Sequence, residues 1–269
     1  MPKAKKTDTA RPTLVTFLLD ETGSMESIKD ATIEGFNAYL AKLKAAKEPI
    51  DFTLLKFDSR RIEKVCIAIP VADVTELNSA TYQPGASTPL IDAACKTIKA
   101  VEKSLNGQKP NVIVCIQTDG HENASTEHSW AELNALIKEK SAAGWQFNFL
   151  GTGIDAYDTG ARMGVAAMHT LSSGLTGEHV RASYAAVADS CLAYARGDAS
   201  STEFSMAARE ASGDAFYKQA GLGTKAKAAP QKNAPQKNAS QRAAQQPSVP
   251  PAAPPPAKPR RPIVDDFTL

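Results

Sequence analysis

Oxygen-bearing side chains follow two apolar runs of the sequence, at positions where a strand would end. The run TLVTFLLD ends at Asp20 and continues as E-T-G-S, so Thr22 and Ser24 follow at alternate positions. The run NVIVCIQTD ends at Asp119, and Thr88 lies in the stretch P-G-A-S-T-P-L before a helical pattern. These groups offer three hydroxyls and two carboxylates. Ligands that are all oxygen suit a small, hard cation such as Mg²⁺.

Strand-like and helix-like stretches alternate along the chain and would position these groups. Strand-like runs occupy 13–20, 50–58, 61–70, 111–119 and 145–155, and apolar residues at helical spacing occupy 25–43, 90–105, 130–137 and 180–194. The runs at 50–58 and 61–70 are joined by two residues, which predicts a hairpin and one antiparallel strand. We therefore expect an α/β fold: a doubly wound, mostly parallel sheet with one antiparallel edge strand and helices on both faces. Ligands of such sheets bind at the carboxyl ends of the strands.

Composition divides the chain into segments. Ten of its 17 prolines lie at or beyond Pro230, in a stretch that holds too few apolar residues to offset the entropy of ordering it. We expect a flexible basic N-terminal arm at 1–12, the α/β domain at 13–195, a helical or irregular C-terminal extension at 196–220, a disordered tether rich in Pro, Ala, Gln and Lys at 221–262, and a possible docking peptide at 263–269.

The net charge of +2 conceals a split between these segments. Residues 1–12 carry +3 and residues 221–269 carry +6, whereas residues 13–220 carry −7. Basic arms can bind nucleic acid, so association with nucleic acid through the arms is one alternative function. Only the charge of the arms supports this alternative, because residues 221–262 lack the aromatic side chains on which bases stack.

Cysteine use and the chain's start indicate the compartment. The four cysteines are far apart and form no C-x-x-C pair, so neither a disulfide framework nor a zinc site is expected. No apolar stretch follows the basic residues at the start, and no apolar run approaches the ~18 residues that span a membrane. The sequence therefore predicts a cytoplasmic protein without a membrane segment.

The order of the oxygen-bearing motifs matches a known family. D-x-T-x-S after the first strand, a Thr in a later G-x-S-T-P-L loop, and T-D-G after a central strand resemble the metal-ion-dependent adhesion site of von Willebrand factor A-type (integrin I-like) domains. All five positions of the family's motif hold a matching residue here, with Thr22 in place of the commoner serine. The resemblance covers about residues 13–195. The resemblance implies that Thr22, Ser24 and Thr88 touch a Mg²⁺ (or Mn²⁺). It also implies that Asp20 and Asp119 hold the ion through water or hydroxyl hydrogen bonds.

Such a site implies binding and no catalysis. Neutral hydroxyls leave the ion much of its positive charge, so a carboxylate from an Asp or Glu of a protein partner can replace a bound water. We therefore expect an intracellular, metal-dependent protein-binding module that acts as a scaffold or in recruitment and is not an enzyme. Glu21, Asp58 and Glu122 are candidate partner contacts at the rim, and Phe267 is the candidate contact of a second partner at 263–269.

A phosphatase is the enzymatic alternative. The DETGS stretch also resembles the D-x-T-G-T loop of haloacid-dehalogenase-type phosphotransferases, which would make Asp20 the nucleophile of a Mg²⁺-dependent phosphatase. The later TDGHEN stretch resembles that family's G-D-G-x-N-D loop, but Ala124 stands where its last Asp belongs. Between residues 71 and 110 no Lys follows a suitable strand, apart from those on the predicted helix. We rank this alternative below the binding module.

Overall fold

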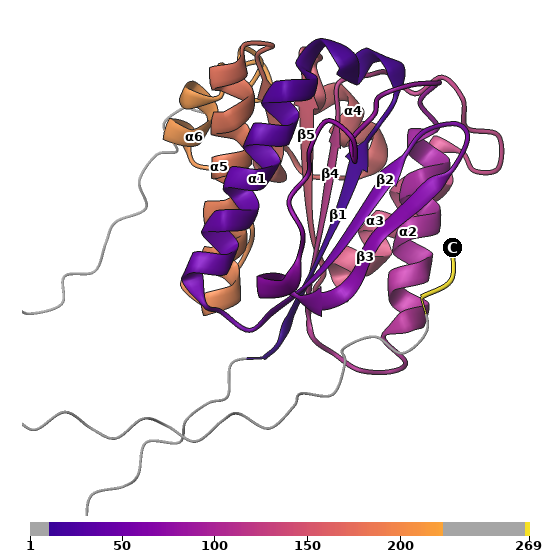
Figure 1. The fold of residues 1–269 in the computed structure, drawn as a ribbon, viewed down its shortest axis with the longest axis vertical. Helices are drawn as coiled ribbons and strands as arrows, with labels where there is room; N and C mark the ends of the chain where they lie inside the picture. The colour runs from indigo at the N-terminus through magenta and orange to yellow at the C-terminus, as the bar shows by residue number, and fades with distance from the viewer. Residues whose placement is uncertain (1–10, 223–266) are drawn as a thin grey trace, which may run out of the picture. The chain divides into compact units, whose positions relative to one another are not determined.

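A single six-stranded sheet runs through the computed structural model, which describes residues 11–222 and 267–269 (Figure 1). Its strands are β1 (Thr13–Asp20), β2 (Ile50–Phe57), β3 (Ile62–Pro70), β4 (Asn111–Thr118), β5 (Gln146–Thr152) and β6 (Thr170–Ser173). Their order across the sheet is β3-β2-β1-β4-β5-β6. Every neighbouring pair is parallel except β2 and β3, which form the antiparallel hairpin at one edge.

Helices cover both faces of the sheet. They are α1 (Lys29–Ala46), α2 (Leu90–Ser104), α3 (Trp130–Ala142), α4 (Ala156–Met163), α5 (Gly177–Arg196) and α6 (Met206–Ala211), with short 3₁₀ turns at Gly23–Ile28, Val71–Asp73 and Ala167–His169. Helices α1 and α5 pack side by side over one face, and α2 and α3 lie over the other (Figure 1). The predicted fold class, a doubly wound sheet with one antiparallel edge strand, is confirmed.

Two apolar clusters hold these layers together. In the first, the ring of Phe17 from β1 lies 5.6 Å from that of Phe36 and 5.9 Å from that of Tyr184, measured between centroids. The second joins Leu18 of β1 to Ile98 of α2. Successive side chains of a strand point to opposite faces, so neighbours in β1 serve different clusters. This is why β1 is apolar along its length and buried throughout.

Side-chain caps set the ends of several helices. Ser129 and Glu132 form a reciprocal capping box at the start of α3. The carboxylate of Asp155 accepts a hydrogen bond from the Tyr157 amide over 3.0 Å and begins α4. The strand predicted at 145–155 therefore stops earlier, at Thr152. Helix α4 and strand β6 were not predicted from the sequence, since β6 has only four residues and two of them are serines.

The segment after α5 is anchored to the sheet by a buried ionic cluster. Arg209 of α6 is fully buried, and its guanidinium donates to the carbonyl of Thr170 over 2.6 Å and to the hydroxyl of Tyr157. The Tyr157 hydroxyl donates in turn to Asp214 over 2.6 Å. The Asp214 carboxylate lies 3.6 Å from the Arg209 guanidinium. This segment, predicted as helical or irregular at 196–220, thus includes α6 and packs on the domain.

Several expected segments lie wholly or mostly outside the described residues. These are the N-terminal arm up to residue 10, the tether from residue 223 and the first four residues of the expected docking peptide. Phe267, Thr268 and Leu269 are described; Phe267 contacts Lys64 of β3, and Thr268 contacts Lys103 of α2. Within the described part, no helix combines the length and the apolar character needed to cross a membrane.

Candidate metal centre

The five predicted ligand residues meet at the carboxyl edge of the sheet. Asp20 ends β1 and Asp119 follows β4, which is the parallel neighbour of β1. Thr22 and Ser24 lie at the start of the 3₁₀ turn after β1, and Thr88 comes just before α2. The chain winds away from β1 in both directions, to β2 on one side and β4 on the other. Doubly wound sheets bind ligands at this kind of switch point.

A chain of hydrogen bonds links the three hydroxyls to Asp119. The hydroxyl of Thr88 donates to Thr22 Oγ1 over 3.1 Å, and Thr22 Oγ1 lies 3.4 Å from Ser24 Oγ. Ser24 Oγ then donates to Asp119 Oδ1 over 2.7 Å. Thr22 and Thr88 are buried, Ser24 is exposed and Asp119 is half-buried. The cluster therefore extends from the interior to the surface.

Asp20 forms the floor of this cluster and is completely buried. Its Oδ1 accepts from the Thr22 amide over 2.7 Å, and its Oδ2 accepts from the Thr118 hydroxyl over 2.5 Å. The Tyr82 hydroxyl donates to its carbonyl over 2.6 Å. Burial raises the pKa of Asp20 to about 6 against the lowering effect of the bonds from Thr118 and Thr22. Burial also raises the pKa of Asp119.

The loop that carries Thr88 is tied to the loops after β1 and β4. The amide of Gly85 donates to the carbonyl of Glu21 over 2.9 Å. The Thr88 amide donates to Asn123 Oδ1 over 2.8 Å, and the Asn123 amide donates back to the Thr88 carbonyl over 3.1 Å. Asn123 therefore fixes the backbone that presents the third hydroxyl. This role of Asn123 cannot be predicted from the sequence, because an Asn in a polar loop gives no signal of its own.

Gly120 leaves space for two of the hydroxyls. A Cβ at this position would lie 3.2 Å from Ser24 Oγ and 3.2 Å from Thr88 Oγ1. Such contacts are tighter than a methyl group ordinarily makes, so a side chain here would push the hydroxyls apart. The glycine of the T-D-G motif thus has a physical role in the site.

The donor set fits a small divalent cation. The groups are neutral hydroxyls and carboxylates, the oxygen ligands that Mg²⁺ and Mn²⁺ accept. Among residues 11–222 and 267–269, no basic side chain forms an ion pair with either Asp20 or Asp119. Over the same ranges, no group of three or more His, Cys, Asp or Glu is placed to hold a metal. A cation at this edge would therefore depend on hydroxyl ligands. It would supply the positive counter-charge that the carboxylates of Asp20 and Asp119 lack.

Two of the predicted partner contacts, Glu21 and Asp58, form ion pairs within the domain. Glu21 is buried, forms an ion pair with Lys56 over 2.8 Å and accepts from the Gln83 amide over 2.8 Å. Asp58 is also buried and accepts from the Arg60 guanidinium over 2.5 Å. Both carboxylates thus already bind groups of the domain. Contact of Glu21 or Asp58 with a partner stays a prediction.

The other two predicted contacts lie apart from the hydroxyl cluster. Glu122 accepts from the amide of Ile91 over 2.9 Å and from that of Ala124 over 2.8 Å, so it braces the loop after β4 against the start of α2. Phe267 contacts Lys64 of β3 and belongs to neither loop of the cluster. Glu122 is thus a second residue, with Asn123, that shapes this edge through the backbone.

The hydrogen bonds that Asp20 accepts bear on whether it could act as a nucleophile. Both of its carboxylate oxygens already accept hydrogen bonds, and the side chain has no exposed surface. The buried Lys56 lies on the neighbouring strand, where its ammonium pairs with Glu21 and with Glu63 at 3.3 Å. An attacking carboxylate needs an oxygen directed at the substrate. This geometry does not provide one.

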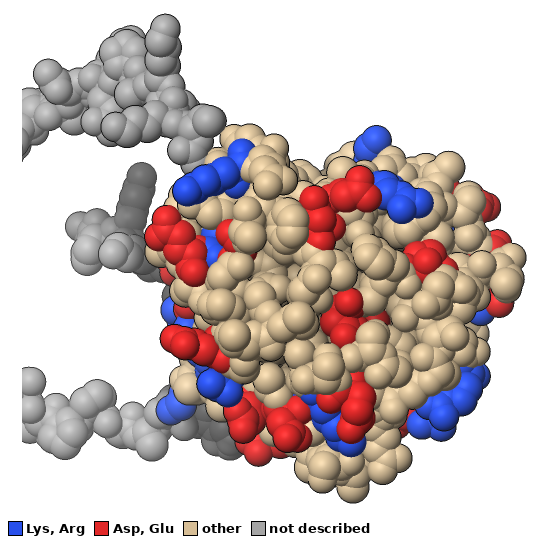
Figure 2. All heavy atoms as spheres, turned by 90° about the horizontal axis from the view of Figure 1, so that it is seen from above, with Lys and Arg blue, Asp and Glu red and all other residues tan. Residues whose placement is uncertain are grey.

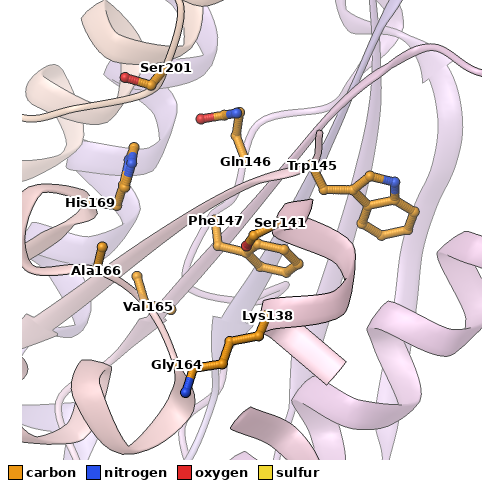
Figure 3. A pocket seen from close by; sticks show the side chains of 10 residues that line it. All are labelled: Lys138, Ser141, Trp145, Gln146, Phe147, Gly164, Val165, Ala166, His169 and Ser201. Carbon is orange, nitrogen blue, oxygen red and sulfur yellow. The ribbon is translucent and has the colours of Figure 1, made fainter. Parts of the chain in front are cut away.

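The surface around the cluster can be followed in Figure 2, which views the carboxyl edge from above. Uncharged residues cover much of its middle, acidic groups interrupt it, and Lys and Arg lie towards the rim. A separate cavity of about 340 Å³ lies at the opposite end of the sheet (Figure 3), where Phe147, His169 and Lys138 are among its lining residues. It begins at the first residues of β5 and is therefore remote from the hydroxyl cluster.

Comparison with known proteins shows the fold and no close relative. No family model matches the sequence, and no curated protein matches it. Among solved structures, the pilus adhesin SpaC from Lactobacillus rhamnosus GG in an open conformation aligns with a TM-score of 0.54 at 12% identity, covering 69% of this chain and 30% of that one. Proximal thread matrix protein 1 from the mussel byssus aligns with a TM-score of 0.50 at 15% identity, covering 68% and 48%.

A von Willebrand factor type A structure from Catenulispora acidiphila also aligns, with a TM-score of 0.49 at 14% identity, covering 70% of this chain and 44% of that one. The chain thus spans less than half of each of these three proteins. The likeness to the adhesin and the matrix protein establishes a shared fold. The mostly parallel sheet with the antiparallel edge strand β3 agrees with the fold class expected from the sequence.

Proposed function

We propose that the protein is a metal-dependent protein-binding module whose site is the hydroxyl cluster at the carboxyl edge of the sheet. One observation carries the proposal. The side chains of Thr22, Ser24 and Thr88 converge from two loops onto a hydrogen-bonded chain that ends on Asp119, above the buried Asp20. The sequence resemblance assigns these same residues to a metal site. Their position at the carboxyl edge of the sheet, where ligands of doubly wound sheets bind, supports the proposal.

Each residue has a distinct task in this proposal. Asp20 holds the Thr22 backbone and contributes negative charge from below the cluster, while Asp119 orients the Ser24 hydroxyl. The neutral hydroxyls would be direct ligands. When bound, Mg²⁺ or Mn²⁺ supplies a positive charge that these ligands only partly neutralise. The exposed Ser24 and the half-buried Asp119 keep the cluster open to a carboxylate from an Asp or Glu of the partner.

The fold comparison favours binding over catalysis. SpaC, which shares the fold, is a pilus adhesin. The inward hydrogen bonds of both Asp20 oxygens weigh against the phosphatase alternative. No described feature adds to the case for nucleic-acid binding, which rests on the charge of the two arms. We therefore infer that this chain recognises a protein partner, as an adhesin does.

An intracellular location is also part of the proposal. All four cysteines are free, and Cys115 and Cys191 form no disulfide although their sulfur atoms lie 3.9 Å apart in the core, within hydrogen-bonding distance of each other. Such thiols persist in a reducing compartment, whereas oxidising compartments favour disulfides. Recruitment or scaffolding in the cytoplasm is therefore the role that we propose.

Calorimetry on the full chain tests the metal site. We expect one Mg²⁺ or Mn²⁺ per chain, and Asp119→Ala should weaken its binding at least ~10-fold because the Ser24 hydroxyl loses its acceptor and the site loses a charge. Thr88→Ala should do the same by removing a ligand. Ser87→Ala is the matched control, since this neighbouring hydroxyl is exposed. Equal affinity in the wild type and in the Asp20→Ala/Asp119→Ala double variant would refute the metal site.

Partner capture tests the second step. The wild-type chain should retain a protein partner in Mg²⁺ and release it in chelator, and Asp20→Ala should fail to retain it in either condition. Ser87→Ala should behave as the wild type. Metal-independent capture by every variant would leave the metal site without a role in binding. Turnover of an activated aryl phosphate that Asp20→Asn abolishes would replace the binding proposal with the phosphatase.

A further inference from the structure

The last three residues of the chain lie on the domain's own surface, between β3 and α2. The Lys64 ammonium of β3 donates to the carbonyl of Phe267 over 3.1 Å and lies 6.0 Å from the centre of its ring. The Lys103 ammonium, in the last turn of α2, donates to the hydroxyl of Thr268 over 3.4 Å. Figure 1 shows the C-terminal segment beside α2. Two elements that are distant in sequence thus hold one short segment.

The surface beneath this segment is apolar. Strand β3 is at the edge of the sheet, with a neighbouring strand on one side only. Its residues Ile62 and Ile67 are partly buried against the apolar cluster that lies under α2, and Phe267 packs against the same cluster. The aromatic ring therefore adds to the partly buried apolar residues on the α2 side of β3.

Charge complements this apolar contact. Neither Lys64 nor Lys103 forms an ion pair with an acidic side chain of the described residues. The sequence places Asp265 and Asp266 immediately before Phe267. Two lysines that pair with no acidic side chain among residues 11–222 and 267–269, beside partly buried apolar residues of β3, match a short segment that carries two carboxylates and then an aromatic ring.

We propose that the β3–α2 surface is a recognition site for a short acidic–aromatic segment, and that its occupant is residues 265–269 of the same chain. Lys64 and Lys103 select the segment by charge and hydrogen bonding, and the partly buried apolar residues of β3 select Phe267. The proposal is independent of the metal site. It changes the expectation for 263–269: the segment is an internal ligand, and any second partner that carries a similar sequence must compete with it.

The length of the intervening chain allows this contact. Residues 223–266 number 44, which can span up to ~150 Å when extended, so reach is no obstacle. The entropy of closing a loop grows only slowly with its length. A tethered segment is present at an effective concentration on the order of millimolar. A contact that would be weak between separate molecules can therefore be well populated within one chain.

Zero-length carbodiimide coupling on the full chain tests the proposal. The reagent joins a lysine amine to a carboxylate that it contacts, so Lys64 and Lys103 should couple to Asp265 or Asp266. Coupling of Lys96 to Glu127, which pair over 2.6 Å within the domain, is the internal standard. An equal mixture of unlabelled and ¹⁵N-labelled chains at low concentration should give products within one isotope only. The measurements are made in chelator, so they do not depend on metal.

Variants make the test specific. Phe267→Ala should reduce the Lys64 and Lys103 products about tenfold relative to the internal standard, because it removes the apolar part of the contact. Val249→Ala, an apolar substitution elsewhere in the tail, is the matched control and should leave them unchanged. Products that equal the wild type in Phe267→Ala, or the lack of these products while Lys96 and Glu127 couple, would overturn the proposal. Products that join the two isotopes would show that the occupant is a second copy.

Discussion

The cluster of Arg209 and Asp214 and the cluster of Asp20 and Asp119 differ in whether the charges of their carboxylates are balanced. At the edge next to β6, the carboxylate of Asp214 faces the guanidinium of Arg209, and the Tyr157 hydroxyl bonds to both. At the carboxyl edge, Asp20 and Asp119 have hydroxyls and amides around them and no basic side chain of the described residues paired with them. The first cluster is complete with the groups of the chain itself. The second lacks a positive charge.

This difference separates a structural cluster from a candidate binding site. Burying an ion costs several kcal/mol, and a partner of opposite charge recovers much of that cost. Arg209 and Asp214 provide this for each other and so attach the segment after α5 to the sheet. The raised pKa of Asp20 reflects a carboxyl group that lacks such a partner. A cation from solution would complete the second cluster as Arg209 completes the first.

The largest expected effect is on the balanced cluster. Arg209→Ala leaves the buried Asp214 without its counter-charge and should lower the free energy of unfolding by about 3–5 kcal/mol. Thermal or denaturant unfolding measures it. Arg181→Ala is the control, because Arg181 pairs with Glu34 at the surface and should contribute less than about 1 kcal/mol. If the two variants lost equal stability, the buried cluster would not anchor this segment.

A second prediction uses the unbalanced cluster. The pKa of Asp20 is about 6 in the folded state, against 3.8 for the free group. A raised carboxyl pKa stabilises the fold below the unfolded value, and this contribution is lost as pH rises through the folded value. In chelator, the wild type should therefore lose up to about 3 kcal/mol between pH 4 and 7 relative to Asp20→Asn. Metal affinity should rise over the same interval, because the cation needs the ionised carboxylate.

Unfolding curves across this pH range, with and without Mg²⁺, check the second prediction. The difference between wild type and Asp20→Asn is the relevant quantity, since other carboxyl groups titrate in the same range. Asp155→Asn is a suitable control, because Asp155 caps α4 away from the cluster. Parallel profiles of unfolding free energy against pH for wild type and Asp20→Asn in chelator would contradict a raised pKa of Asp20 in the folded state.

Sequence alone located the five candidate ligands because strand periodicity and turn residues are local signals. The apolar runs that end at Asp20 and Asp119 predict where two strands end. Because ligands of such sheets bind at the carboxyl ends of the strands, the polar residues there are the candidates. The motif could not reveal which way a rim side chain points. Glu21 is predicted to contact a partner, and the structure adds that its carboxylate pairs with the buried Lys56 of the next strand. That pairing depends on sheet register, which no local pattern contains.

Non-local contacts also determine features that the sequence does not predict. The four residues of β6 have no strand signal of their own and are ordered by pairing with β5. Arg209 was one of many charged residues in the sequence, and its buried position depends on Tyr157 and Asp214. The contact between Phe267 and Lys64 joins positions about 200 residues apart. In each case the free energy comes from a partner that is distant in the sequence.

The smallest expected effect concerns the space above the hydroxyls. Gly120→Ala would bring a methyl group to 3.2 Å from the hydroxyls of Ser24 and Thr88, which must then shift by tenths of an ångström. A divalent cation such as Mg²⁺ demands near-ideal geometry, so its affinity should fall about tenfold, or about 1.4 kcal/mol, while stability in chelator changes less. Gly177→Ala is the matched control, because its methyl group would meet the flexible end of Arg181 at 3.1 Å. Calorimetry on both variants decides the point. If Gly120→Ala bound metal as tightly as Gly177→Ala, the two hydroxyls would not both be ligands, and the unbalanced cluster would have to recruit its cation through the carboxylates alone.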